Sequence, residues 1–354
     1  MERIQISVFG PANSGKSTLV NALCGQEVSL VSPIPGTTTD PVRKAIELPY
    51  GIGPAVIVDT AGLDDASLLG AERKRRTEQV IDTTDIAIVL GADEPSTQAL
   101  LKQLEDIPVV RYRQGESVDG LLQKIAAALP SQKESFLTGR LVKEGSTVVL
   151  VMPQDSEAPK GRLILPQVQV LRELLDRGCI PVCCTPEKLP AALASLAAQP
   201  DLVITDSQAF AKVNASIPES TPLTSFSILL AAAKGDIHSF AQGAGAIKKL
   251  QPGARILIAE ACTHVPNTED IGRVKIPALL RKRIHPLEVD IAAGNDFPED
   301  LSPYSLIIHC GACVASARLV RARIKKALRA GVPITNYGMA LAHLQGILER
   351  ISLP

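Results

Sequence analysis

Two groups of residues in this chain have types and spacings that indicate chemistry. The first is a glycine-containing stretch at residues 10–17, Gly-Pro-Ala-Asn-Ser-Gly-Lys-Ser. The second is a pair of short motifs, Cys-Thr-His at residues 262–264 and His-Cys-Gly-Ala-Cys at residues 309–313. The first stretch is suited to binding phosphates, and the motif pair is suited to binding a soft metal. The sequence therefore predicts a protein that uses both a nucleotide and a metal site.

Residues 10–17 match the spacing GxxxxGK(S/T) and lie between an apolar run of strand length and a helical pattern that begins near Ser17. In this arrangement backbone N–H groups wrap the phosphates, a lysine neutralises the β and γ oxygens, and a hydroxyl binds Mg²⁺. Lys16 and Ser17 take the last two roles here. The predicted nucleotide contacts of the loop are Gly10, Asn13, Ser14, Gly15, Lys16, Ser17 and Thr18.

Two further segments follow in the order that a GTPase requires. Asp59-Thr60-Ala61-Gly62 ends the next clear apolar strand, which would place the Asp59 carboxylate near Mg²⁺ and the Gly62 amide near the γ-phosphate. Between them, Pro-Gly-Thr-Thr-Thr-Asp at residues 35–40 resembles the first switch of translation-factor-type GTPases, with Thr38 as the Mg²⁺ ligand in the triphosphate state. Lys16, Thr38 and Gly62 are the predicted catalytic residues.

Two features of this region bear on catalysis and selectivity. Asn13 and the first switch resemble the potassium-stimulated GTPases, in which the asparagine helps to hold a K⁺ ion that acts in place of an arginine finger. Leu63 stands where Ras-like enzymes have the glutamine that orients water, so we expect slow intrinsic hydrolysis. The base-reading motif Asn-Lys-x-Asp is absent between residues 85 and 129, and Val-Val-Arg-Tyr-Arg at residues 109–113 occupies its place. GTP is predicted as the nucleotide, without strict selectivity for guanine.

The cysteine and histidine motifs each follow an apolar run with the length of a buried strand. Because the carboxyl ends of parallel strands meet at one edge of a sheet, we expect Cys262, Cys310 and Cys313 to converge. A helical pattern at residues 314–330 begins beside Cys313, and the dipole at its N-terminus would favour thiolates.

Three thiolates and two histidines leave two metals open. Zinc would take three cysteines and one histidine in a closed tetrahedral site. A 4Fe–4S cluster would take the three cysteines, with His264, His309 or an exchangeable ligand at the fourth iron. Spacing alone does not choose between them. The other four cysteines lie on or beside apolar segments and are predicted to be small core residues: Cys24, Cys179, Cys183 and Cys184.

Composition limits the class of protein. A chain of 354 residues with 45% hydrophobic residues predicts two or three domains with substantial cores. Lys plus Arg (37) equals Asp plus Glu (37) and aromatic residues are only 3%, which argues against a nucleic-acid partner. No apolar run approaches the roughly 20 residues needed to cross a bilayer. The seven cysteines are better explained as ligands or catalysts than as disulfides if the protein is cytoplasmic, which is the predicted location.

Apolar runs of strand length alternate with helical patterns along the chain, as parallel sheets with crossover helices require. The predicted strands are residues 4–9, 55–59, 86–90, 108–111, 147–152, 180–184, 202–205, 255–259, 287–292, 305–309 and 333–335. Polar segments at residues 130–145 and 216–222 divide the chain. The predicted fold class is α/β with three domains: an N-terminal P-loop GTPase domain, residues 1–130, followed by two smaller parallel-sheet α/β domains, residues 145–222 and 223–354.

These motifs resemble the FeFe-hydrogenase maturation GTPases, the HydF family. The most specific part of this resemblance is the Cys-x-His motif, followed after residues 265–308 by the His-Cys-x-x-Cys motif. Val265 departs from the family, which often has a second histidine after the CxH motif, and the missing base-reading motif is a second departure. Beyond the phosphate loop, the similarity runs nearly end to end through residues 35–41, 158–167, 258–264, 296–302 and 332–338.

The resemblance implies a dimerisation domain at residues 145–222 and a cluster-binding domain at residues 223–354, in a homodimer. It implies that a 4Fe–4S cluster on Cys262, Cys310 and Cys313 supports a diiron precursor bearing CO, cyanide and a dithiolate bridge. The precursor would be delivered to the apoprotein of FeFe-hydrogenase, with radical-SAM maturases as upstream partners. Nucleotide turnover would then act as a switch between partners or domains.

Two other functions stay open at this point. GTPases of RNA modification and ribosome assembly have the most similar switches, although the neutral charge and the few aromatic residues argue against RNA. A nucleotide-regulated zinc protein that acts as an interaction module is the second alternative. It would be colourless and insensitive to iron chelation.

Overall fold

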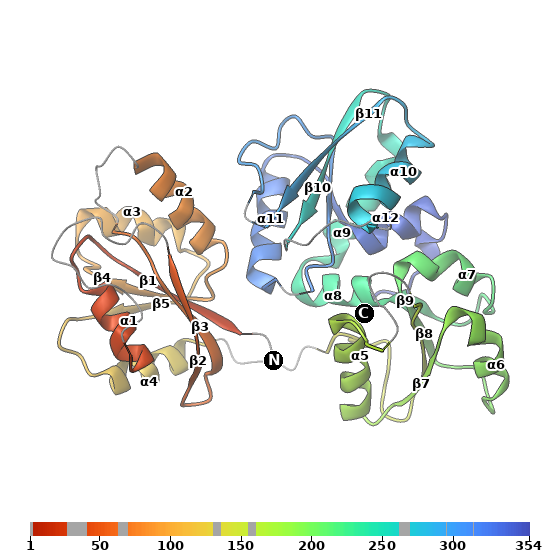
Figure 1. Ribbon diagram of the computed structural model, residues 1–354, viewed down its shortest axis with the longest axis horizontal. Helices are drawn as coiled ribbons and strands as arrows, with labels where there is room; N and C mark the ends of the chain where they lie inside the picture. The colour runs from red at the N-terminus through yellow and green to blue at the C-terminus, as the bar shows by residue number, and fades with distance from the viewer. Residues whose placement is uncertain are drawn as a thin grey trace. The chain divides into compact units, whose positions relative to one another are not determined.

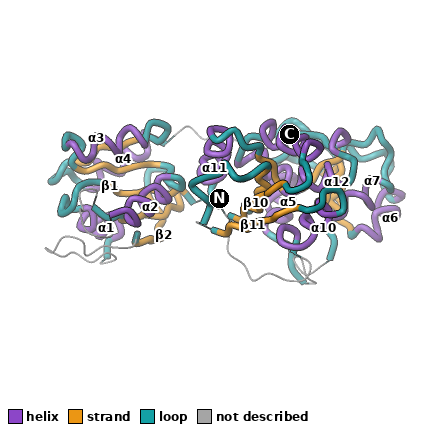
Figure 2. Tube along the Cα trace, turned by 90° about the horizontal axis from the view of Figure 1, so that it is seen from above, coloured by secondary structure: helices purple, strands orange, loops and turns teal. Residues whose placement is uncertain are grey.

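The computed structural model describes residues 3–26, 41–62, 70–129, 136–154, 161–261, 270–294, 296–313 and 315–354. The chain divides into two compact units, Met1–Lys133 and Glu134–Pro354 (Figure 1). The first unit contains a five-stranded sheet and the second contains two four-stranded sheets. Helices and strands alternate in both units (Figure 2). No helix in the described part of the chain is long and apolar enough to span a membrane.

The sheet of the first unit has the order β2-β3-β1-β4-β5, and only the β2–β3 pairing is antiparallel. One face packs on α1 and α4 and the other on α2 and α3, each through its own hydrophobic cluster. The strands are β1 (Ile4–Phe9), β2 (Val42–Leu48), β3 (Gly53–Asp59), β4 (Ile86–Leu90) and β5 (Val109–Tyr112), and the helices are α1 (Lys16–Cys24), α2 (Gly70–Ile81), α3 (Pro95–Gln103) and α4 (Val118–Ala128).

Every strand of this sheet was predicted except the edge strand β2. β1 and β4 are buried along almost their whole length because both of their faces are covered by helices. β2 has the sequence Val-Arg-Lys-Ala-Ile-Glu-Leu and alternates between half-buried and exposed positions, as an edge strand does. Its three charged residues hid it from a search for apolar runs.

The second unit contains two sheets in which every pairing is parallel, with the orders β7-β6-β8-β9 and β11-β10-β12-β13. The first sheet consists of β6 (Thr147–Val151), β7 (Ile180–Cys184), β8 (Leu202–Thr205) and β9 (Leu223–Ser225), with α5 (Leu165–Asp176), α6 (Leu189–Ala194), α7 (Phe210–Asn214) and α8 (Phe226–Lys234). The second sheet consists of β10 (Ala254–Glu260), β11 (Leu287–Ala293), β12 (Leu306–His309) and β13 (Ile334–Asn336), with α9 (Ile237–Ala246), α10 (Ile276–Arg281), α11 (Ala317–Arg329) and α12 (Tyr337–Leu344). The predicted fold class, a P-loop unit followed by parallel α/β regions, is confirmed.

The two sheets of the second unit share one hydrophobic core. A single cluster of buried side chains includes Val149 and Phe210 from the first sheet region and Leu257 and Ile324 from the second. β9, which was not predicted, extends the first sheet beyond the predicted domain boundary at residue 222. The regions on either side of that boundary therefore fold as one packing unit.

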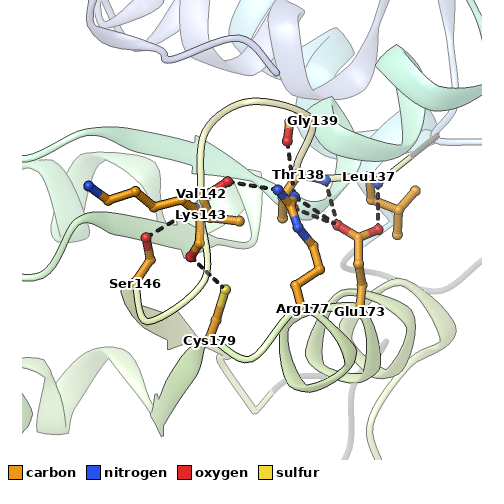
Figure 3. Close-up of polar contacts among 9 residues, drawn as sticks. All are labelled: Leu137, Thr138, Gly139, Val142, Lys143, Ser146, Glu173, Arg177 and Cys179. Carbon is orange, nitrogen blue, oxygen red and sulfur yellow. Dashed lines mark hydrogen bonds and ion pairs between the residues drawn. The ribbon is translucent and has the colours of Figure 1, made fainter. Parts of the chain in front are cut away.

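The beginning of the second unit is tied down by α5, although residues 136–145 were predicted to belong to a linker. Glu173 Oε1 accepts hydrogen bonds from the Thr138 amide (2.9 Å) and hydroxyl (2.5 Å). Arg177 donates to the Thr138 hydroxyl (2.6 Å) and to the Val142 carbonyl (2.7 Å), as Figure 3 shows. The second half of the predicted linker is thus a packed segment.

Replacement of Glu173 by Ala should lower the free energy of unfolding by about 1 to 3 kcal/mol, because it leaves the amide and hydroxyl donors of the buried Thr138 without their acceptor. Urea denaturation followed by circular dichroism measures this change. The Arg172→Ala variant is the matched control, because Arg172 pairs with Asp176 on the same helix at an exposed position. Its effect should be clearly smaller than that of Glu173→Ala, and an equal effect of both variants would contradict the anchoring role.

Candidate functional site

The phosphate loop joins β1 to α1 at the carboxyl end of a central strand. Lys16 is the first residue of α1 and only 7% exposed, and its ammonium donates to the carbonyl oxygens of Gly10 (3.0 Å) and Pro11 (2.6 Å). The ammonium therefore lies inside the loop, where a bound phosphate would compete with these carbonyls for it. This is the position that the predicted role of Lys16 requires.

The backbone of the loop explains two of its glycines. Gly15, with φ +89°, is left-handed, a region that glycine adopts without strain. A side chain at Gly10 would bring its Cβ to 2.9 Å from the Leu90 carbonyl oxygen. Asn13 also has a left-handed backbone (φ 58°) and an exposed side chain. The Ser14 hydroxyl is buried and has no hydrogen-bond partner among the described residues, so a phosphate oxygen would supply one.

The two predicted Mg²⁺ ligands from different segments meet in the structure. The Ser17 hydroxyl donates to Asp59 Oδ2 at 2.7 Å, and Asp59 is fully buried at the end of β3. The neighbouring Thr60 hydroxyl donates to the Val8 carbonyl (2.7 Å), which fixes this strand end against β1. Thr18 lies exposed on the first turn of α1.

Gly62 lies directly against the phosphate loop. A Cβ at this position would lie 2.8 Å from Cα of Ala12, a distance that forces one of the two segments to move. The segment Asp59-Thr60-Ala61-Gly62, the second switch, can approach the phosphate loop this closely only because residue 62 has no side chain. This agrees with a role for the Gly62 amide at the γ-phosphate. The predicted contributions of Thr38 and Leu63 lie outside the described residues.

The turn after β5 contains none of the groups that read guanine. Tyr112 donates to the Glu116 carbonyl (3.2 Å), and the Glu116 carboxylate pairs with Lys124 (2.5 Å) and accepts the Arg113 amide (3.4 Å). These contacts close the turn on itself. Residues 85–129 contain no asparagine.

The cysteine motif lies at the carboxyl end of β12, beside the end of β10. Cys310 Sγ accepts hydrogen bonds from the amides of Ala261 (3.1 Å) and Ala312 (3.4 Å). Ala261 directly precedes Cys262, so the chain that carries the third cysteine contacts Cys310 immediately before it. Amides that donate to sulfur stabilise the thiolate, which is the form that binds metals.

Two predicted ligands, Cys262 and His264, lie outside the described residues. Within the part of the chain that the structure describes, no three His, Cys, Asp or Glu side chains form a group that could hold a metal ion. The donors that are described, Cys310 with its two amide partners and the half-buried Cys313, fit thiolate ligation of a cluster.

Both ring nitrogens of His309 are engaged by the protein. His309 is 1% exposed, its Nδ1 lies 2.8 Å from the Cys310 carbonyl oxygen, and its Nε2 lies 3.1 Å from Arg323. Because a guanidinium only donates, Nε2 accepts and Nδ1 carries the proton. Burial, and then the charge of Arg323, lower the pKa of His309 to about 4. His309 is a neutral structural contact here, and metal binding through it would break one of these bonds.

Two arginines that were not predicted hold the end of β10. Arg273 contacts both carboxylate oxygens of the buried Glu260, at 2.6 to 3.2 Å. Arg323 donates to the Glu260 carbonyl (3.3 Å), and its guanidinium lies over the Phe297 ring at 4.9 Å. Arg273 therefore holds the end of β10 through the Glu260 side chain, and Arg323 holds it through the Glu260 backbone carbonyl. Cys262 follows this strand end.

The helix α11 buries one of its arginines. Arg323 is 3% exposed, whereas Leu328 is 56% exposed. Arg323 stands three residues after Val320 and directly before Ile324, so helical spacing already placed it on the buried face. Its charge masked this signal.

Tyr337 is a further residue at this site that was not predicted. Its hydroxyl is buried, has no hydrogen-bond partner among the described residues and lies so close to Gly272 that no side chain fits there. Burial, followed by the charge of Cys310, raises the pKa of Tyr337 well above its usual value. A neutral hydroxyl donor is thus available beside the cysteine motif.

The remaining cysteines agree with the core prediction except for one. Cys179 is buried, and Cys24 and Cys184 are half-buried against hydrophobic clusters. Cys183 is exposed, because strand alternation at the edge strand β7 turns it away from Cys184.

The fold and the loop geometry define the first unit as a P-loop GTPase domain, and a family model described as a 50S ribosome-binding GTPase matches residues 5–116. The hydrogen maturase F dimerization domain matches residues 137–235, and the hydrogen maturase F tetramerization domain matches residues 238–354. The chain belongs to the hydrogen maturase F (HydF) family.

Curated relatives resemble the GTPase domain. The tRNA modification GTPase MnmE of Acidiphilium cryptum is 49% identical over 94 residues, which are 26% of this chain and 21% of that protein. MnmE of Thermus thermophilus is 30% identical over 207 residues, which are 49% of this chain and 47% of that protein. The chain spans about a fifth to a half of the length of these relatives.

Solved structures of GTPases are more distant. Era of Aquifex aeolicus bound to GDP and AlF4⁻ is 16% identical, with 55% of this chain and 98% of that chain covered and a TM-score of 0.30. Toc33 of Arabidopsis thaliana is 17% identical, with 52% and 71% covered and a TM-score of 0.26.

Replacement of Lys16 by Ala should lower the rate of GTP hydrolysis by at least about 100-fold, because it removes the one ammonium that the loop holds for the phosphates. Phosphate release measured at saturating GTP tests this. Lys102→Ala, at an exposed position of α3, is the control and should keep the wild-type rate. Hydrolysis at the wild-type rate by the Lys16 variant would contradict the assignment of the loop.

Proposed function

We propose that this protein is a GTP-hydrolysing scaffold and carrier in the maturation of FeFe-hydrogenase. It binds a 4Fe–4S cluster, holds a diiron precursor on it and delivers the precursor to the apo-hydrogenase. The observation that carries the proposal is the Cys310 thiol, which accepts two amide hydrogen bonds, one of them from the residue that precedes Cys262. A P-loop site in the same chain and membership in the HydF family support it.

The cluster would be held by Cys262, Cys310 and Cys313, and it supplies a soft metal–sulfide surface for the precursor. His264 or an exchangeable ligand is the fourth donor that we favour, because both nitrogens of His309 are already bonded. The protein residues around the cluster would stabilise its negative charge. Amides donate to the Cys310 sulfur, and Arg273 pairs with the buried Glu260 carboxylate at the strand end.

The nucleotide site would act as a switch. Lys16 binds the β and γ oxygens, Ser17 and Asp59 hold Mg²⁺, and Gly62 donates its amide to the γ-phosphate. We further propose that Thr38 completes the Mg²⁺ site and that Asn13 holds K⁺. Loss of the γ-phosphate releases the two switch segments and changes contacts with domains or partners, so hydrolysis need not drive the metal chemistry.

Self-association through the first sheet of the second unit fits its edges. The edge at β9 is partly covered, because the Ser352 amide donates to the Leu223 carbonyl (2.8 Å). The opposite edge strand, β7, exposes Ile180 (57%) and Cys183. An uncovered strand edge favours pairing with a second copy, and we propose a homodimer formed there. The radical-SAM maturases and the apo-hydrogenase would be its other partners.

Replacement of Cys310 by Ser should lower the iron and sulfide bound per chain and abolish activation of apo-hydrogenase, without changing GTP hydrolysis. Anaerobic reconstitution followed by iron, sulfide and zinc analysis measures this. Cys183→Ser is the matched control, because Cys183 is exposed on β7, and it should bind iron like the wild type. Stoichiometric zinc without sulfide in the wild-type chain would contradict cluster binding and support the zinc alternative.

Guanine selectivity should be weak, because the turn after β5 offers no asparagine and closes on its own contacts. We expect GTP to bind more tightly than ATP by no more than about tenfold, which corresponds to about 1.4 kcal/mol. Calorimetric titration with GTP, ATP and inosine triphosphate measures this. Equal affinities for GTP and ATP would remove guanine selectivity altogether, and a preference of about 1,000-fold would reveal a base contact elsewhere.

A further inference from the structure

The two sheets of the second unit are built to the same register. In the first sheet Thr147 of β6 is opposite Ile180 of β7, and in the second sheet Arg255 of β10 is opposite Glu288 of β11. Arg255 lies as many residues after Thr147 as Glu288 lies after Ile180. Equal strand order and equal register in two adjacent sheets indicate a tandem repeat.

The ends of the two sheets agree with this in sequence and in hydrogen bonding. The last strands begin with Pro-Leu-Thr-Ser-Phe at residues 222–226 and Pro-Ile-Thr-Asn-Tyr at residues 333–337. The first carbonyl of each segment accepts an amide at 2.9 Å, from Val203 in the first repeat and from Ile307 in the second. In both repeats the fourth residue of the segment caps the following helix, α8 or α12.

Each repeat contacts the strand ends of the other. Ser207, after β8, lies against the start of α12, where its hydroxyl would be 3.2 Å from a Cβ at Gly338. Gly311, after β12, lies against the start of α8, where its Cβ would be 3.9 Å from Cβ of Ser227. In both cases the loop after the third strand of one repeat packs against the start of the last helix of the other repeat. The cysteine motif is therefore packed against the first repeat.

One side chain at the end of α8 binds the loop that carries Cys310 and Cys313, here called the cysteine loop. The Lys234 ammonium donates to the carbonyl oxygens of Ala312 (2.8 Å), Cys313 (3.1 Å) and Ala315 (2.7 Å). Ala312 has a left-handed backbone, with φ 50°, which is strained for a residue with a side chain. Three carbonyls that converge on one cation hold the loop in this conformation.

The corresponding residue of the second repeat is neutral. Gln345, which ends α12, accepts the Ala211 amide at 2.9 Å and lies 3.5 Å from the Ser207 carbonyl in the loop after β8. The same position thus holds a strand-end loop in both repeats. At this position the cysteine loop is held by a charged side chain and the loop after β8 by a neutral one.

We propose that Lys234 is a positioning residue of the cluster site, supplied by the first repeat to the second. It turns the loop carbonyls toward itself and thereby keeps the Ala312 amide on Cys310 Sγ. Its charge offsets that of an anionic cluster and stabilises the reduced, more negative state. This inference rests on the proposed cluster binding. It also means that the dimerization segment contributes to the site in the adjacent segment.

The test uses the full-length chain reconstituted anaerobically, with the variants Lys234→Gln, Lys234→Arg and Gln345→Ala. We expect Lys234→Gln to lose iron to a chelator about tenfold more readily and to show a more negative cluster reduction potential, measured by a redox titration followed by electron paramagnetic resonance. Lys234→Arg should restore the potential. Gln345→Ala removes the matching contact of the other repeat and should leave iron binding and potential unchanged.

Iron retention and a reduction potential equal to wild type in Lys234→Gln would overturn the proposal for Lys234 and leave cluster binding intact. A wild-type chain that binds neither iron nor sulfide would instead remove the cluster-binding function itself. Amide hydrogen exchange of residues 311–316 in the metal-free protein is an independent readout. It should be faster in Lys234→Gln than in wild type, and unchanged exchange would contradict the positioning role. If Lys234→Gln does not fold, Lys234→Arg decides by the same exchange and potential measurements, which should match wild type.

Discussion

Both functional loops of this protein depend on a lysine ammonium bonded to main-chain carbonyl oxygens. In the phosphate loop Lys16 binds two carbonyls of the residues that precede it, and in the cysteine loop Lys234 binds three carbonyls of a distant segment. Carbonyls that turn toward a cation leave the neighbouring amides directed to the opposite side. Those amides are the groups that an anion needs, a phosphate in one case and a thiolate in the other. The same interaction therefore shapes a phosphate site and a sulfur site on unrelated loops.

Parallel strands explain where these loops lie. In each sheet the central strand is flanked by the strands that follow it, so the carboxyl ends of neighbouring strands bring separate segments together. Ser17 meets Asp59 in this way, and Cys310 meets Ala261. The duplicated arrangement of the second unit adds a further level, because the starts and ends of α8 and α12 reach across to the other repeat. The cysteine loop therefore depends on the sheet beside it, and so does the cluster site that we propose there.

Much of the fold follows from apolar periodicity. The bounds of β1, β4, β7 and β8 were predicted correctly, because each of them is a mainly apolar run of strand length between polar turns. β2 was missed because an edge strand carries charged residues, and β9 because its three residues directly follow the polar segment 216–222 that was predicted to divide the chain. The repeat in the second unit was also missed, since its sequence similarity is confined to one short segment and its register is visible only in the pairing of strands.

The sequence by itself determined the phosphate loop, the order of strands and helices that positions it, and the cysteine spacing, because these depend on residues close together in the chain. Only the tertiary structure decided the partners of these residues. The neutral state of His309 depends on its burial and on Arg323, the strand end before Cys262 depends on Arg273, and the cysteine loop depends on Lys234. Each of these is a charged side chain whose default place is the solvent. Its burial becomes favourable only when distant segments supply carbonyls and carboxylates. A local pattern can indicate the buried face, as helical spacing does for Arg323, but it does not identify these partners.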